Sequence, residues 1–251
     1  MDPTKLRALL DAVRSGDVEI ETAMAKLRDL PYTDLGYAMV DHHRALRQGV
    51  PEVIFGEGKT ASQIIGIAQS IVGHGSICFI TRVSPDKAAE IVTAFPDARH
   101  AEIARTITIA RAPIEPRGSG PVAIIAAGTS DLPVAEEACE TLAALGREVL
   151  RMYDVGVSGI HRILMRREEI ARAVCVIVCA GMEGALPSVV GGLTDRPVIG
   201  VPTSIGYGTA LAGFTPLMAM LTSCASGVTV VNIDNGFGAA FAAARIDRVS
   251  R

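Results

Sequence analysis

The chain has 251 residues, 49% of them hydrophobic and 20% charged, a balance that can bury a sizeable core and argues against a disordered protein. Its formal net charge of -3 argues against a general binder of nucleic acids or membrane surfaces. Trp is absent and aromatic residues make up 4%, which disfavours the base-stacking surfaces of single-strand-binding proteins.

The N-terminal half is expected to be a smaller α+β domain, residues 1–115. Its first 14 residues carry charges throughout and lack the apolar segment of a secretory signal, so a cytoplasmic location is expected. Apolar periodicity predicts its elements in chain order. They are helices 4–15 and 18–28, strands 33–40 and 52–55, helix 60–72, strand 77–83, helix 85–94 and strand 102–110.

Two polar motifs stand out in this half. The sequence HHR at 42–44 is able to bind metal or phosphate, but adjacent histidines on a strand point to opposite faces. The sequence GEGKT at 56–60 places Lys59 at a helix start, where a phosphate can bind. It is not a P-loop, because Val53 stands where the first motif glycine belongs. For both motifs, exposed polar residues without a ligand are the slightly favoured interpretation over a binding site.

The C-terminal half, residues 116–251, follows a break at 112–120 that reads APIEPRGSG. Strand and helix signals then alternate. The strands are 121–127, 147–153, 174–180, 197–203 and 227–234, and the helices are 133–145, 159–170, 185–193, 208–222 and 236 onward. This alternation predicts an α/β fold, a parallel sheet between two helical layers of the flavodoxin-like or Rossmann-like kind.

Two stretches of this half are almost free of charge. Residues 197–233 carry none, and residues 173–193 carry only Glu183. Gly and Pro interrupt both stretches every few residues, which favours buried parallel strands over membrane spans, so no membrane partner is expected. The predicted helix 208–222 has no charge on any face, so we expect it to be buried in a homo-oligomer.

Each predicted strand of this half runs into a loop of small, polar or acidic residues. Such loops converge at the carboxyl ends of the strands, where glycine allows close approach and amides bind phosphate. One loop alone is more often an ordinary turn, but five together predict a nucleotide site. The candidate binding residues are Gly128, Thr129, Ser130, Asp131, Asp154, Gly156, Val157, Gly181, Met182, Gly184, Thr203, Asn232 and Asp234.

Two side chains are candidates for chemistry. Glu183 is a lone carboxylate at a predicted strand end, which leaves a structural acid and a general base as equal alternatives. Cys224 lies in the small-residue turn SCASG, where a thiolate has room, although a buried structural cysteine is the stronger reading of the chemistry alone. The five cysteines have neither a C-x-x-C pair nor zinc spacing, so no metal bound by the protein is expected, nickel included.

Several segments together resemble the LarB family, which makes the first intermediate of the nickel-pincer nucleotide cofactor. They are GTSDLPVAEEA (128–138), DVGVSGIHR (154–162), AGMEGALPSVVGGL (180–193), VPTSIGYG (201–208) and SCASGVTVVNIDNGFGA (223–239). HHRALRQGVPEVIFGEGKT (42–60) resembles the N-terminal domain of that family. The C-terminal half is more distantly similar to the aminoimidazole ribonucleotide carboxylases. Their G-S-x-S-D loop is matched by GTSD at 128–131 of this chain.

The resemblance implies that CO2 carboxylates carbon 5 of the pyridinium ring of nicotinic acid adenine dinucleotide. Hydrolysis of the phosphoanhydride then releases AMP and leaves pyridinium-3,5-biscarboxylic acid mononucleotide. It further implies that the Cys224 thiolate adds at carbon 6 and that Glu183 removes the carbon-5 proton. Loop 129–131 would hold the ribose phosphate, and loop 154–157 would line the other side.

The resemblance also implies Mg²⁺ on the substrate phosphates and a homo-oligomer, of which an octamer built from dimers is one form. His161, Arg44 and Lys59 are weak candidates for assisting the hydrolysis. The purine carboxylases have a G-G-x-x-H-L-P pattern at the position where this chain has GMEGALP, residues 181–187. The His of that pattern is missing here, which disfavours aminoimidazole ribonucleotide as the substrate. A purine-pathway carboxylase or mutase and a non-catalytic nucleotide sensor stay open as alternatives.

Overall fold

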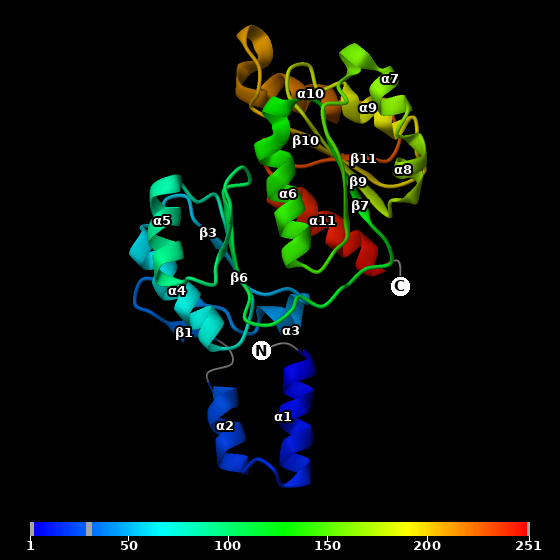
Figure 1. The fold of residues 1–251 in the computed structure, drawn as a ribbon. Coiled ribbons are helices and arrows are strands. Elements are labelled where there is room, and N and C mark those ends of the chain that lie inside the picture. The colour runs from blue at the N-terminus through cyan, green and yellow to red at the C-terminus, as the bar shows by residue number, and fades with distance from the viewer. Residues whose placement is uncertain (1–2, 29–31, 250–251) are drawn as a thin grey trace. The chain divides into compact units, whose positions relative to one another are not determined.

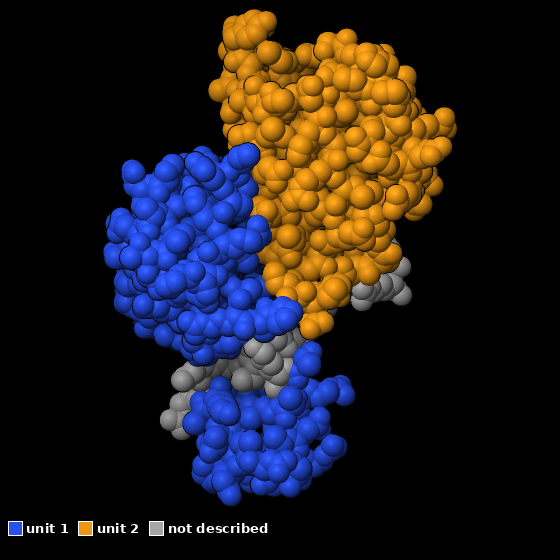
Figure 2. Space-filling view, viewed as in Figure 1, with its two compact units in different colours: residues 1–113 blue, residues 114–251 orange. Residues whose placement is uncertain are grey.

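The computed structural model describes residues 3–28 and 32–249. The chain separates into two compact units, residues 1–113 and 114–251, which are coloured differently in Figure 2. Each unit has its own sheet and its own buried apolar cluster. No helix in the described part of the chain has the length and apolar character needed to cross a bilayer.

The N-terminal unit begins with a helical hairpin and continues as a mixed α/β layer (Figure 1). Its elements are α1 (Pro3–Ser15), α2 (Ile20–Arg28), β1 (Thr33–Asp34), β2 (Met39–Val40), α3 (Arg44–Gln48), β3 (Val53–Phe55), α4 (Ala61–Gly73), β4 (Cys78–Thr81), α5 (Pro85–Ala94), β5 (Arg99–Ala101) and β6 (Thr106–Ile109). The larger sheet has the order β3-β4-β6-β5, with β3 parallel to β4 and the other pairs antiparallel. Ile64 of α4 and Ile91 of α5 are fully buried in the apolar cluster that also holds Ile54, Ile80 and Ile107 of the strands.

Three expectations for this unit are wrong in detail. The predicted strand 33–40 is a hairpin of β1 and β2, because Gly36 adopts a left-handed φ of +79° between them. The predicted strand 102–110 begins too early, and the short strand β5 before it is missed. His42 and His43 lie in a turn before the unpredicted helix α3, so they are not strand neighbours.

The C-terminal unit alternates strands and helices from end to end. Its elements are β7 (Val122–Ala126), α6 (Leu132–Ala144), β8 (Val149–Met152), α7 (His161–Leu164), α8 (Arg167–Arg172), β9 (Cys175–Ala180), α9 (Leu186–Gly191), β10 (Val198–Pro202), α10 (Phe214–Leu221), β11 (Val228–Val230) and α11 (Gly236–Val249). The five strands form one all-parallel sheet in the order β11-β10-β9-β7-β8. This is the flavodoxin-like order, and the expected three-layer α/β fold is confirmed.

Helices cover both faces of this sheet. Helices α6 and α11 pack together on one face, and α7 to α10 lie against the other (Figure 1). Every residue of β9 is buried, because this central strand has a strand on each side and a helical layer on each face. The uninterrupted apolar sequence CVIVCA follows from that position, since neither face of the strand meets water.

Two predicted helices of this unit are broken. The prediction 159–170 corresponds to a 3₁₀ turn at Val157–Gly159 followed by the short helices α7 and α8. The prediction 208–222 corresponds to an irregular 3₁₀ segment, Gly208–Gly213, followed by α10. Leu211 and Ala212 have left-handed φ values of 48° and 50°, which an α-helix cannot contain.

Candidate active site

The site of this fold is set by the strand order. The chain moves from β7 outward to β8 and then returns to the other side of β7 to form β9, so the order reverses between β7 and β9. In open parallel sheets ligands bind at such a reversal, outside the carboxyl ends of the strands. We call the segments there, residues 127–131, 153–157, 181–185, 203–207 and 231–235, the strand-end loops.

Backbone strain is concentrated in the strand-end loops. Three residues other than glycine adopt positive φ there, Asp154, Met182 and Asp234, with values of 55°, 52° and 54°. Each lies after a different strand, β8, β9 or β11. Conformations of this kind cost of order 1–3 kcal/mol each and cluster at functional sites. The strain therefore marks the same edge of the sheet as the strand order does.

Asp131 links three strand-end loops through hydrogen bonds. Its Oδ2 accepts from the Gly128 amide at 2.9 Å, and its Oδ1 accepts from the Thr203 hydroxyl at 2.6 Å. The Gly181 amide also donates to the carboxylate. Asp131 and Thr203 are buried, whereas Thr129 and Ser130 are exposed. The carboxylate therefore braces the loops, and the two hydroxyls beside it are open to a ligand.

The pKa of the Asp131 carboxyl group is raised above its ordinary value of 3.8. Burial is the largest cause, because it penalises the charged form, and the negative charge of Asp234 adds to it. The Thr203 hydroxyl and the Gly128 and Gly181 amides act in the opposite direction by stabilising the carboxylate. The group is thus a carboxyl held in a poorly hydrated position by protein donors.

The loop after β8 approaches the loop after β7 closely. A Cβ added at Gly156 would lie 2.8 Å from the Ala127 carbonyl oxygen, so only glycine fits. Asp154 is exposed and forms an ion pair with Arg162 at 2.8 Å. Arg162 was not among the expected site residues, although it ends the motif DVGVSGIHR. It brings a cation to the strand-end loops, and Val157 begins the 3₁₀ turn that leads toward it.

The loop after β9 presents Glu183 to solvent. Gly181 has no room for a side chain, since a Cβ there would lie 2.3 Å from the Ile205 carbonyl oxygen. Met182 donates its amide to the same oxygen at 2.8 Å, and Gly184 turns with a φ of +68° against Pro216. The loop is therefore fixed at both ends, and the exposed Glu183 carboxylate lies at its tip.

The loops after β10 and β11 complete the edge. Asp234 accepts a hydrogen bond from the Ser204 amide at 2.8 Å, and its own amide donates to the Pro202 carbonyl oxygen. Asn232 accepts from the adjacent Ile233 amide at 2.9 Å. These two side chains hold loop backbone in place, as Asp131 does.

Cys224 does not lie at this edge of its own chain. It precedes β11, whose first residue Val228 pairs with Val198, the first residue of β10. Glu183 follows β9, whose last residue Ala180 pairs with the last residue of β10. The four residue steps of β10 between those pairs rise about 13 Å. Cys224 therefore lies toward the amino ends of the strands, so a single chain does not bring its thiol beside the Glu183 carboxylate.

A second observation agrees with this position of Cys224. The neighbouring Ala225 packs against Gly191, where an added Cβ would lie 2.9 Å from the Ala225 side chain. Gly191 is the last residue of α9, the end remote from Glu183. Ser223 lies 2.7 Å from Ser188 of the same helix, measured between their hydroxyl oxygens.

Cys224 differs from the other cysteines in its exposure. It is exposed, whereas Cys78, Cys139, Cys175 and Cys179 are buried. Burial raises the pKa of the Cys139 thiol to about 11 and that of the Cys78 and Cys175 thiols to about 12. A thiolate is the reactive form, so the buried four are inert core residues and Cys224 is the accessible sulfur.

Within residues 3–28 and 32–249, no three His, Cys, Asp or Glu side chains gather in the way that a metal cage requires. Of the carboxylates in the strand-end loops, those of Asp131 and Asp234 accept from backbone amides, and that of Asp154 pairs with Arg162.

Comparison with known proteins assigns each of the two units to a protein family. Residues 32–111 match the family described as LarB/PurE-like N-terminal domain, and residues 121–251 match the AIR carboxylase family. An uncharacterized protein of Methanocaldococcus jannaschii is 40% identical over 252 residues, 97% of either chain. N5-carboxyaminoimidazole ribonucleotide mutases of Pyrococcus horikoshii and Thermotoga maritima are each 36% identical over half of this chain, covering 71% and 73% of their own lengths. The chain therefore belongs to the LarB family of carboxylase and mutase type enzymes, with a LarB/PurE-like N-terminal domain and an AIR carboxylase-like C-terminal half.

Proposed function

We propose that the protein carboxylates carbon 5 of the pyridinium ring of nicotinic acid adenine dinucleotide and hydrolyses its phosphoanhydride. The products are AMP and pyridinium-3,5-biscarboxylic acid mononucleotide. The observation that carries the proposal is the exposure of the Cys224 thiol, since the other four thiols are buried. Carboxylation of an electron-poor ring needs a nucleophile of this kind, whereas a purine-pathway carboxylase does not.

The chemistry follows from the charge on the ring. A pyridinium cation does not attack CO2, because its carbon atoms are electron-poor. When the Cys224 thiolate bonds to carbon 6, the ring becomes a neutral enamine whose carbon 5 is nucleophilic. Carbon 5 then bonds to CO2, and the ring nitrogen becomes positive again. Removal of the carbon-5 proton and breakage of the carbon–sulfur bond restore the aromatic pyridinium and release the thiolate.

Glu183 is the base that we assign to the proton on carbon 5. It is exposed at the tip of the loop after β9, next to the reversal in strand order. A general base must lie within about 3 Å of the proton that it accepts, and carbon 5 is bonded to the carbon that the thiolate attacks. One substrate must therefore meet both Glu183 and Cys224 within a few ångströms.

Because one chain holds these two groups at opposite ends of its strands, the proposal requires a second copy. Cys224 of one subunit would complete the site formed by the strand-end loops of another. The segment between β10 and Cys224 suits such an interface, because it exposes large apolar side chains without any charge. They are Tyr207, Leu211, Phe214, Met218 and Leu221.

The strand-end loops supply the binding groups in this proposal. The exposed Thr129 and Ser130 hydroxyls and the loop amides would hold the ribose phosphate, and Arg162 would face the phosphoanhydride. Asp131, Thr203 and Asp234 fix the backbone that carries them. Mg²⁺ would bind with the substrate phosphates and neutralise part of their charge.

The test is turnover of nicotinic acid adenine dinucleotide with bicarbonate and Mg²⁺, followed by mass spectrometry of the products. We expect AMP and the dicarboxylated mononucleotide, and a covalent Cys224 adduct in the intact mass. Cys224→Ala should lower carboxylation at least about a thousandfold, as loss of a nucleophile does, with the fold preserved. Cys175→Ala is a control at a buried thiol. If the wild-type protein forms neither AMP nor a dicarboxylate, the proposal is excluded.

A purine-pathway mutase is the second candidate, because the relatives with named functions are N5-carboxyaminoimidazole ribonucleotide mutases. Complementation of a strain lacking that mutase would favour it. A nucleotide sensor without catalysis would bind the dinucleotide tightly, form no Cys224 adduct and give no turnover.

A further inference from the structure

A group of cationic side chains lies within the N-terminal unit. It forms where β3 and β4, two parallel neighbours, both end. The loop GEGKT follows β3, and Arg82 follows β4. The Gly56 amide donates to the Thr81 carbonyl oxygen at 2.8 Å, so the two loops touch. A Cβ added at Gly56 would lie 3.0 Å from that oxygen, so the absence of a side chain allows the two backbones to approach this closely.

Two lysine ammonium groups are bonded to the backbone of these loops. Lys59 Nζ donates to the Phe55 carbonyl oxygen at 3.0 Å, and Lys87 Nζ donates to the Gly56 carbonyl oxygen at 3.1 Å. These carbonyls belong to adjacent residues, so both ammonium groups are anchored at the end of β3. Each ammonium has three donors and uses one of them on its carbonyl. Neither forms an ion pair with an acidic side chain of the described residues.

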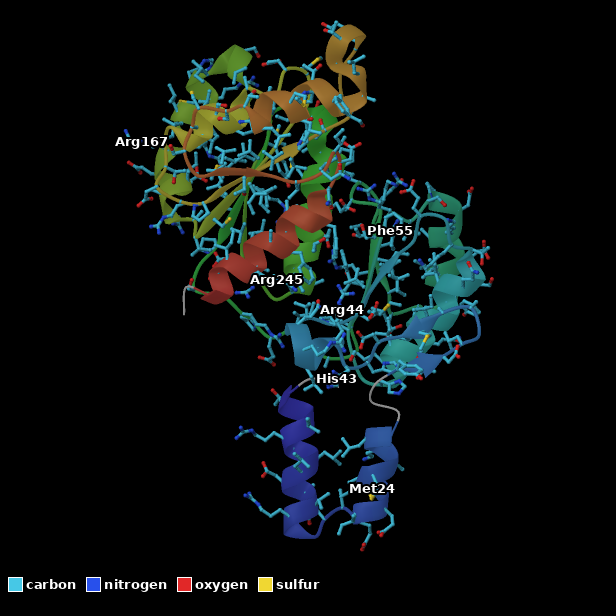
Figure 3. The ribbon with its side chains drawn as sticks, turned by 180° about the vertical axis from the view of Figure 1, so that it is seen from behind. Met24, His43, Arg44, Phe55, Arg167 and Arg245 are labelled. Atoms are coloured by element: carbon cyan, nitrogen blue, oxygen red, sulfur yellow. The ribbon has the colours of Figure 1, made fainter. Side chains whose placement is uncertain are left out.

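Arg82 adds a third cation and an aromatic contact. Its guanidinium carbon lies 5.8 Å from the centre of the Phe55 ring, within cation–π range. Arg82 Nη1 also lies 3.7 Å from Oε2 of Glu57, whose side chain is largely exposed. Phe55 itself is 47% exposed at the end of β3, and its position is labelled in Figure 3.

The distribution of lysine in the chain singles out this group. Of 24 basic residues only four are lysines, and two of the four are Lys59 and Lys87. Elsewhere the chain uses arginine, which commonly pairs with carboxylates, as in the pairs of Arg47, Arg147 and Arg162 with aspartates. Lysine without a carboxylate partner is a compact charge with spare donors, a common way to hold phosphate.

We propose that Lys59, Lys87 and Arg82 form a binding site for the phosphate of a nucleoside phosphate, with Phe55 in contact with the sugar or base. Both ammonium groups are anchored on one short stretch of backbone, and each keeps donors that a phosphate oxygen can accept. Arg82 holds the Phe55 ring and contributes charge. All residues of this site belong to the N-terminal unit, and the proposal does not depend on the chemistry proposed for the strand-end loops.

The test is lysine acetylation of the full-length Cys224→Ala protein, with the rate read at each lysine by mass spectrometry. AMP at about ten times its dissociation constant should slow acetylation of Lys59 and Lys87 about tenfold. Lys26, an exposed residue of α2, serves as the internal control and should react at the same rate throughout. Because the rates are read lysine by lysine, AMP at the strand-end loops is distinguished from AMP at this site.

Adenosine and inorganic phosphate separate the parts of the proposal. Adenosine should protect neither lysine, and inorganic phosphate should protect both more weakly than AMP. Phe55→Ala should reduce the effect of AMP to that of phosphate. The proposal is overturned if AMP leaves both lysines as reactive as before, or if adenosine protects them as well as AMP. Equal protection by phosphate and AMP would overturn the role of Phe55.

Discussion

Asp131 illustrates how a residue in a binding loop can serve the loop and not the ligand. Its sequence context, GTSD after a buried strand, predicts a phosphate or ribose contact. In the folded chain its two carboxylate oxygens accept from Gly128 and Thr203, and Gly181 donates as well. It therefore positions the exposed hydroxyls beside it. A residue that acts in this way should affect stability and activity together.

Asp131→Asn is expected to lower the free energy of unfolding by about 1–3 kcal/mol. Asparagine keeps an acceptor for Thr203, but its NH2 group then faces the Gly128 amide, so two donors meet in a buried place. Chemical denaturation followed by circular dichroism measures the change. Asp154→Asn is a matched control, because its exposed pair with Arg162 contributes less than about 1 kcal/mol. Equal effects of the two substitutions would contradict the bracing role.

The raised pKa of Asp131 gives this effect a pH dependence. In the folded protein the carboxyl group retains its proton above pH 3.8, where the unfolded chain has lost it. The folded state therefore binds more protons, and this contribution to stability falls as the pH rises from 3.8 through the raised pKa. The destabilisation by Asp131→Asn should thus be larger at pH 4.5 than at pH 7. A larger effect at pH 7 would show that burial does not dominate the pKa.

At the scale of elements, helix α11 is bonded at both of its ends to other parts of the C-terminal unit. Near its start, the Phe237 amide donates to the Glu137 carboxylate of α6 at 3.1 Å. Near its end, the fully buried Asp247 pairs with Arg147 and accepts from the Ser119 amide at 2.9 Å. Asp247 thus joins the segment before β7, the segment before β8 and the last helix, three parts distant in sequence.

Asp247→Ala should lower the free energy of unfolding by about 3–5 kcal/mol, because it leaves the Arg147 guanidinium buried without its counter-charge. The midpoint of the denaturation transition of the C-terminal unit measures this loss. Asp195→Ala removes an exposed partner of Arg196 and should change stability by less than about 1 kcal/mol. If Asp247→Ala lowers the free energy of unfolding no more than Asp195→Ala does, Asp247 does not hold these three segments together.

The segment 208–221 explains why one helix prediction failed. Its sequence has no charge on any face, and the prediction of one buried helix runs through Gly213 and Pro216. In the fold, Gly213 adopts a φ of +95° and packs against the Thr203 carbonyl oxygen, so the chain must turn before α10 can begin. That contact comes from the loop after β10 and is not encoded in the local pattern.

At the scale of the whole molecule, the separation of Cys224 from Glu183 yields a test of assembly. If each site combines the two residues from different subunits, a mixture of Cys224→Ala and Glu183→Gln chains regains activity. Random co-assembly of equal amounts should restore about a quarter of the sites of a closed homo-oligomer. Each variant alone should be inactive, and the mixture should be assayed after dissociation and reassembly. No recovery in a proven mixed oligomer would place both residues within one subunit.

The sequence by itself determined the α/β class of the C-terminal unit and its strand-end loops, because the apolar period and the punctuating Gly and Pro residues are local properties. It also determined the family, through segments such as SCASGVTVVNIDNG. The tertiary structure alone decided which polar side chains brace and which stay open, as with Asp131 and Ser130. It also decided that Cys224 and Glu183 lie at opposite ends of parallel strands. The physical reason is that hydrogen bonding and distance depend on strand pairing between residues remote in sequence, which no local pattern specifies.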